Sequence, residues 1–253
     1  MTSSEARPEL TCSADRLETS ATISSGTSAE LVWRLILKDC RLQRGQFVFT
    51  IAGGAISLAV LSIVQLRSEA PVVVGTVCFF IAIILSAHMV PLVGIVNERK
   101  SRNLAFVMSL PISSIQYTAA KLISTLVMFL VPWLMLVASA LLLIEVRGII
   151  PRGSIPVALI LVLLPLVGLS LITAAALIGE SEGWGIAANV FCSSTYGLTW
   201  YFLSQVPALM GPAKGPVPVW NGTALSILGG ELAFVVLLLG LTFYLQSRKR
   251  DFV

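Results

Sequence analysis

The stretch that decides the fold is residues 97–121, which read NERKSRNLAFVMSLPISSIQYTAAK. It is the longest polar segment between two long apolar runs. It opens with four charged residues between positions 98 and 102, continues with an apolar patch at 104–108, and then meets the helix-breaking sequence Ser-Leu-Pro at 109–111. Ser113 and Gln116 follow at the spacing of a capping box, so we expect a new helix to begin there.

This segment is far longer than a turn between two membrane helices requires. Within it, Leu104, Phe106, Val107 and Met108 place apolar side chains next to the charges. Such a segment either lies in the membrane interface as an amphipathic helix or offers an apolar ridge to a groove on a soluble partner. The residues alone leave both interpretations open.

The composition of the whole chain indicates a membrane protein. Hydrophobic residues make up 56% of the 253 residues, charged residues only 12%, and the mean hydropathy is +0.91. A soluble domain carries about a quarter charged residues, so we predict an all-α integral membrane protein. The four cysteines lack the spacing of a disulfide framework or a metal site.

Six apolar runs are long enough to cross about 30 Å of hydrocarbon as helices. We predict spans at 47–66, 71–96, 122–144, 155–179, 184–206 and 224–245. They make up one six-helix transmembrane domain, residues 30–253. Residues 1–29 are rich in Ser and Thr and have no apolar periodicity, so we expect a disordered tail.

The segment from Leu31 to Gln46, immediately before span one, mixes apolar and basic residues. This pattern predicts an amphipathic helix lying at the membrane surface. The apolar positions in the pattern are Leu31, Val32, Ile36, Leu37 and Leu42.

The cations predict the orientation of the chain. Eleven Lys and Arg residues fall on the side of the N-terminus: Arg34, Lys38, Arg41, Arg44, Arg99, Lys100, Arg102, Lys121, Arg248, Lys249 and Arg250. Four fall in the opposite loops: Arg67, Arg147, Arg152 and Lys214. By the positive-inside rule, both termini and the 97–121 segment are expected in the cytoplasm.

Sequence patterns for catalysis are absent. The chain has no G-x-x-x-x-G-K-[S/T] sequence for nucleotide binding and no H-E-x-x-H sequence for zinc. Its single histidine, His88, has no acidic neighbour in the sequence. We therefore predict no catalytic residue, no metal site and no directly bound cofactor. An intramembrane enzyme that uses His88 or Glu231 is the weaker alternative.

Four polar residues stand out within the predicted spans: His88, Asn189, Ser193 and Glu231. Polar groups in lipid face the bundle interior or find partners across helices. These residues therefore either line a translocation path or hold helices together. The sequence leaves both roles open.

Several short sequences together resemble a known family. Lys38-Asp39 precedes span one, Glu98-Arg-Lys follows span two, Ser-Leu-Pro-Ile-Ser occupies 109–113, and Tyr117 with Ala120-Lys121 opens span three. This arrangement resembles the permease subunit of type-2 ABC exporters. The resemblance runs from about residue 31 to the end of the chain.

The resemblance implies specific roles. The helix before span one would be an elbow helix, and the segment after span two would be a cytoplasmic coupling helix that docks on a separate ABC ATPase subunit. That subunit would bind ATP and Mg²⁺. The coupling role would fall to Glu98, Arg99, Lys100, Leu104, Phe106, Val107 and Met108, with Glu98 pairing with basic residues at the subunit interface.

The resemblance also implies a partner and a location. Two permease chains, identical or similar, would assemble in a prokaryotic plasma membrane and export a hydrophobic or amphipathic cargo. Nucleic acid is not an expected partner. A membrane assembly or immunity factor that does not transport is the alternative, because its 97–113 segment would also bind a soluble partner.

Overall fold

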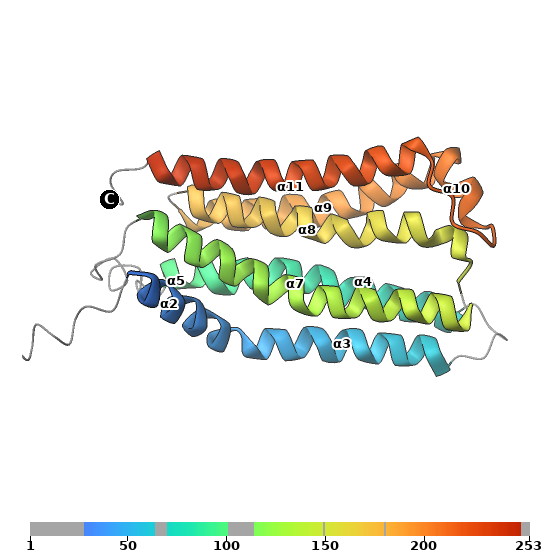
Figure 1. Cartoon of the computed structure of the whole chain (residues 1–253), viewed down its shortest axis with the longest axis horizontal. Helices are drawn as coiled ribbons and strands as arrows, with labels where there is room; N and C mark the ends of the chain where they lie inside the picture. Colours follow the sequence, from blue (N-terminus) through green and yellow to red (C-terminus); the bar gives the residue numbers. More distant parts are fainter. Residues whose placement is uncertain (1–27, 64–69, 101–113, 149, 180, 249–253) are drawn as a thin grey trace, which may run out of the picture.

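The computed structural model describes residues 28–63, 70–100, 114–148, 150–179 and 181–248, and within these ranges the chain is helical and has no strands (Figure 1). The predicted all-α fold is confirmed for this part of the chain. The longer helices are α2 (Ser28–Leu42), α3 (Arg44–Ile63), α4 (Ala70–Pro91), α7 (Ser114–Arg147), α8 (Ile155–Ile178), α9 (Glu182–Ser204) and α11 (Gly222–Arg248). The short ones are the π-helical turn η1 (Leu92–Val96), α5 (Asn97–Lys100), the 3-10 turn η2 (Arg152–Ser154) and α10 (Pro207–Ala213).

Five helical stretches in the described ranges are long and apolar enough to cross a membrane. They are Arg44–Ser62, Pro71–Val96, Ile115–Arg147, Arg152–Ile178 and Gly222–Arg248. Each contains one of the predicted spans or overlaps most of it. A multi-pass membrane protein is therefore compatible with the fold as well as with the composition.

The remaining predicted span, 184–206, is not among these five. It lies in α9, which is helical over 23 residues, but polar side chains such as Asn189, Ser193 and Ser194 lower the hydropathy of this helix. The prediction of six spans is thus supported by hydropathy for five, and for α9 only the helix is observed.

The long helices lie roughly side by side along one axis (Figure 1). The helices α2 and α5 and the C-terminal end of α11 lie at one end of the bundle, called here the α2 end, and α10 lies at the other, the α10 end. The helices α4 and α8 are the most buried spans, with 61% and 67% of their apolar windows inside, against 11% for α11. The central core is built largely from Phe79, Ile83 and Ala87 of α4, Phe129 of α7 and Leu169 of α8.

The segment predicted as an amphipathic helix at 31–46 is helical as α2 up to Leu42, and its last residues begin α3. The buried residues of this segment differ from the predicted apolar set. The buried side chains are Leu35, Ile36, Asp39 and Gln43, whereas Leu37 and Leu42 are exposed. Positions 35, 39 and 43 are one turn apart and form one stripe along the helix. Two of these three positions are polar, so apolar residues alone do not reveal this face.

The helical path that begins as α4 continues past residue 96, where the predicted span ends. Pro91 is followed by the π-helical turn Leu92–Val96, and the chain then continues as α5 to Lys100. Single π-helical turns often occur at functional sites. Here the turn carries Glu98 of α5 toward α2 and α7. After residues 101–113, which are not described, α7 begins at Ser114, close to the helix start predicted near Ser113.

Some predictions fall outside the described residues. The tail is described only from residue 28, and the apolar patch at 104–108 lies in the range 101–113, which is not described. Between the predicted spans 184–206 and 224–245, the structure has the short helix α10, which was not predicted.

Candidate functional site

The most charged buried site lies at the α2 end and is centred on Lys121 of α7. The Nζ atom of Lys121 lies 2.7 Å from Oδ2 of Asp39 on α2 and 2.5 Å from Oε2 of Glu98 on α5. It also donates to the carbonyl oxygen of Gly94 in the π-helical turn at 3.1 Å. The exposed fractions of the three charged side chains are only 1% for Lys121, 2% for Asp39 and 9% for Glu98.

Three further side chains complete this site, which we call the Lys121 cluster. The hydroxyl group of Tyr117 donates to Oε2 of Glu98 at 3.3 Å. The hydroxyl group of Ser124 lies 3.4 Å from Oδ2 of Asp39. Nζ of Lys38, which is half exposed, lies 3.3 Å from Oε1 of Glu98. The cluster thus joins α2, the π-helical turn with α5, and α7.

In the Lys121 cluster, one ammonium group forms ion pairs with two carboxylates, those of Asp39 and Glu98. Burial raises the pKa of the Asp39 carboxyl above its ordinary value of 3.8, and the charge of Lys121 opposes this rise. The negative charge of the Glu98 carboxylate adds to the rise, because it disfavours a second negative charge on Asp39. A buried charge that loses its partner is strongly destabilising, so the three elements are constrained to stay together.

The predicted coupling residues are only partly described. Glu98 is placed in the Lys121 cluster, where its carboxylate has partners within the chain. The backbone of Arg99 and Lys100 lies in α5, and their side chains are outside the described part of the structure, as are Leu104, Phe106, Val107 and Met108. No contact of these six side chains with a partner can therefore be assigned from the fold.

A second polar site, the His88 cluster, lies between α4 and α9, with His88 buried, Asn189 and Tyr196 half-buried and Ser193 exposed. The ring of His88 is buried, and its Nδ1 donates to Oδ1 of Asn189 at 2.6 Å. The hydroxyl group of Tyr196 donates to Nε2 of His88 at 3.0 Å. Ser193 Oγ lies 3.4 Å from Nδ1. Three of the four predicted path residues, His88, Asn189 and Ser193, are therefore brought together.

The geometry of the His88 cluster ties Ser193 more closely to its own helix than to the histidine. Nδ1 of His88 lies 2.6 Å from Oδ1 of Asn189 but 3.4 Å from Oγ of Ser193, and Nε2 lies 3.0 Å from the hydroxyl group of Tyr196. The hydroxyl group of Ser193 instead donates to the carbonyl oxygen of Asn189 at 2.9 Å. The arrangement is that of a hydrogen-bonded contact between two helices.

Glu231 lies apart from these residues. It is on α11, which packs mainly on α8 and α7, whereas the His88 cluster lies between α4 and α9. The Oε2 atom of Glu231 is buried and has no hydrogen-bond partner in the described part of the chain. Among the described residues, no group of three or more His, Cys, Asp or Glu side chains could hold a metal ion.

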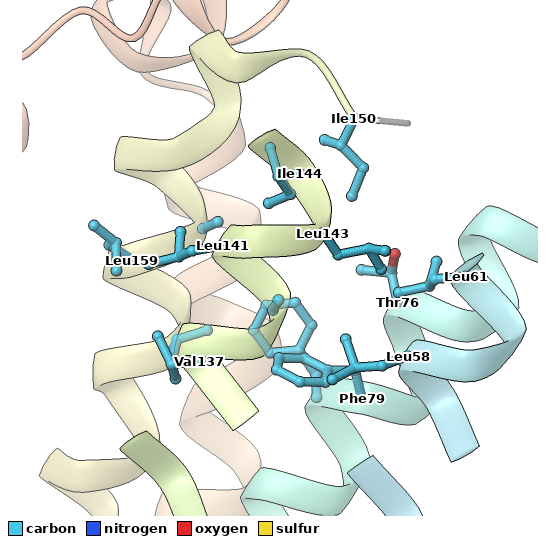
Figure 2. Close-up of a pocket in the computed structure, with 14 residues that line it drawn as sticks. Leu58, Leu61, Thr76, Phe79, Val137, Leu141, Leu143, Ile144, Ile150 and Leu159 are labelled. Carbon is cyan, nitrogen blue, oxygen red and sulfur yellow. The ribbon is translucent and has the colours of Figure 1, made fainter. Parts of the chain in front are cut away.

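Two apolar hollows flank α4 toward the α10 end. One is a cavity of about 80 Å³ between α3, α4, α7 and α8, and Figure 2 shows Leu58 and Leu61 on one side and Val137, Leu141 and Leu159 on the other. The second is a groove of about 520 Å³ between α4 and α8, to which Tyr196 and Trp200 of α9 contribute. Neither offers a cluster of polar groups for catalysis.

Sequence reasoning missed the buried role of Asp39 and Lys121. Lys121 was counted among the cytoplasmic cations, although it directly precedes the apolar run that begins at Leu122. A lysine at the edge of an apolar run, together with Asp39 in the stripe of Leu35 and Gln43, is a signal for such a pair. Tyr196, which contacts Nε2 of His88, is likewise not among the four predicted path residues.

Comparison with known proteins adds no relative. No protein-family model matches the chain, and neither a curated protein nor a solved structure shows significant similarity to it. The function must therefore be argued from the residues themselves.

Proposed function

We propose that this chain is the permease subunit of a type-2 ABC exporter, which moves a hydrophobic or amphipathic cargo with ATP hydrolysed on a separate ATPase subunit. In this proposal α9 is the sixth span, α2 is the elbow helix, and the α2 end faces the cytoplasm. The chain pairs with a second permease chain in the plasma membrane. It has no catalytic site of its own.

The observation that best supports this proposal is the Lys121 cluster. A coupling segment must pass the movement of a soluble partner to the membrane helices, so its base has to be fixed to them. Glu98 lies at the start of the 97–113 segment and is tied to Lys121, and through it to Asp39 of α2. A force applied to this segment would therefore act on α2, α4 and α7 together.

A second supporting observation is the position of the cluster relative to the charges of the chain. It lies at the end of the bundle where α2, α5 and the end of α11 meet (Figure 1). Among the described residues, helix segments at this end carry six Lys and Arg side chains, which are Arg34, Lys38, Arg41, Arg44, Lys121 and Arg248. The positive-inside rule assigns such an end to the cytoplasm. A soluble ATPase would meet the chain on this side.

The test is purification of the tagged chain from its own cells in a mild detergent, with mass spectrometry of the proteins that accompany it. We expect an ABC ATPase subunit in stoichiometric amount. The double variant Phe106→Asp/Val107→Asp should lose it, because it places two charges in an apolar contact. Val217→Asp at the α10 end is the matched control: Val217 is an exposed apolar residue, and this variant should keep the ATPase.

Two results would count against the proposal. A preparation without an ATPase, from cells that express such subunits, would favour a membrane protein that does not transport. An ATPase that remains bound to the double variant would show that residues 104–108 are not its docking site.

A further inference from the structure

The groove between α4 and α8 has the dimensions of one leaflet of a bilayer. The α4 residues that line it run from Val73 to Ile84, which corresponds to about 17 Å along the helix. Half of a hydrocarbon core of about 30 Å is about 15 Å. Residues 73–84 also occupy the first half of the candidate span Pro71–Val96, so the groove extends from the α10 boundary of the membrane to its middle.

The lining of the groove is apolar, and the groove opens to the outside of the bundle. Val73, Val77 and Ile81 of α4 are one turn apart and about half exposed. The opposite wall consists of Leu161, Leu164 and Pro165 of α8. A surface of this kind within a membrane span contacts hydrocarbon.

Trp200 and Tyr196 of α9 lie at the two ends of the groove, Trp200 toward the membrane surface and Tyr196 toward the membrane centre. Trp200 lies near the end of α9 on the α10 side and is half exposed. A tryptophan at this depth suits the boundary between headgroups and hydrocarbon. Tyr196 lies one turn deeper, and its hydroxyl group is directed to His88. The inner end therefore presents the ring of Tyr196 rather than a free donor.

We propose that this groove binds one acyl chain of a bilayer phospholipid from the leaflet at the α10 end. The chain would enter beside Trp200 and end with its methyl group near Tyr196 and Ile84. The volume of about 520 Å³ lies within the range of about 300–1,000 Å³ typical of small-molecule sites. A helix of a second chain fits less well, because it would have to cross the full membrane whereas the groove ends halfway. The proposal does not depend on the presence of an ATPase.

The test uses phosphatidylcholine that carries a photoactivatable diazirine on one acyl chain, either near the carbonyl group or at the methyl end. The purified full-length chain is placed in phosphatidylcholine vesicles, irradiated, and analysed by peptide mapping. We expect the first probe to label the region of Val73 and Trp200. The second probe should label Ile84 and Leu164. Both labels should exceed the labelling of exposed apolar residues on α3 and α11, such as Ile56 and Val236, which do not line this groove.

Two variants sharpen this test. Ile81→Trp places a bulky side chain over the groove and should reduce the labelling of Leu164 to the level of α11. Ile56→Trp on α3 is the matched control, because Ile56 is also exposed and lies outside the groove. It should leave the labelling of Leu164 unchanged.

Three results would overturn the proposal. The first is equal labelling of the groove, α3 and α11 in the unmodified chain, which would indicate ordinary lipid solvation. The second is crosslinking of the groove to a second copy of the chain in place of lipid. The third is undiminished labelling of Leu164 in folded Ile81→Trp. If Ile81→Trp does not fold, the proposal is tested by the unmodified chain alone. There the probe near the carbonyl group must label Val73 and Trp200, and the probe at the methyl end must label Ile84 and Leu164.

Discussion

Replacing Lys121 with methionine should be among the most destabilising substitutions at the α2 end of the bundle. Methionine keeps an unbranched side chain of similar length but removes the ammonium group. The Asp39 carboxylate then loses its partner at 2.7 Å and keeps only the hydroxyl group of Ser124 at 3.4 Å. Glu98 loses its partner at 2.5 Å but keeps Tyr117 and Lys38.

The magnitude follows from the burial of these groups. Removing one partner of a buried ion pair costs about 3–5 kcal/mol, because an uncompensated charge remains in a low dielectric. We expect Lys121→Met to lower the free energy of unfolding by this amount. Lys38→Met removes an ammonium group from the same cluster, but the Lys38 side chain is 54% exposed. An exposed pair of this kind contributes less than about 1 kcal/mol.

The assay is reversible unfolding by sodium dodecyl sulfate in mixed micelles, followed by circular dichroism. The double variant Asp39→Asn/Lys121→Met serves as a rescue, because it removes the buried Asp39 carboxylate that has lost its ammonium partner. It should recover at least about 1–3 kcal/mol of the loss, because the desolvation penalty of an unsatisfied buried polar group has this size and that of a charged group is larger. A cost for Lys121→Met no greater than that for Lys38→Met would refute the reasoning, and so would a double variant less stable than Lys121→Met.

Two further predictions concern Asp39 and His88. Burial raises the pKa of Asp39 above 3.8, although Lys121 and Lys38 lower it and Glu98 raises it further. The folded state therefore holds a proton that the unfolded chain has released, and the free energy of unfolding should fall as the pH rises from about 3.8 toward the folded-state pKa. Asp39→Asn should remove this decline in unfolding titrations over that range. In the same assay His88→Leu should cost about 1–3 kcal/mol, because two interhelical hydrogen bonds of about 0.6–1.7 kcal/mol each are lost, whereas Leu134→Ala at an exposed site should cost less.

The helices could be predicted because their signal is local. An apolar run of sufficient length identifies a span without knowledge of its neighbours, and five of the predicted spans were found in this way. The helix near 184–206 was also found, but its polar residues make hydropathy a weak guide to whether it crosses the membrane. The start of α7 could also be predicted locally, because Ser113 and Gln116 have the spacing of a capping box and α7 begins at Ser114.

The Lys121 cluster could not be predicted in the same way, because its members are distant in sequence. Lys121 is 82 residues from Asp39, and Lys38 is 60 residues from Glu98. The sequence showed the charges but not which of them would be buried together. For Glu98 it suggested a partner on another subunit, whereas the structure supplies partners within the chain. The His88 cluster has the same character, since Asn189 lies 101 residues from His88.

The separation of Asp39 and Lys121 has a consequence for the synthesis of this protein. At about 5–20 residues per second, the 82 residues between them take roughly 4–16 s to translate. During that time the nascent chain contains Asp39 but not the lysine that neutralises it. Helix α2 therefore cannot reach its final packing before α7 has been made. The order of synthesis delays completion of the α2 end until the third candidate span has emerged.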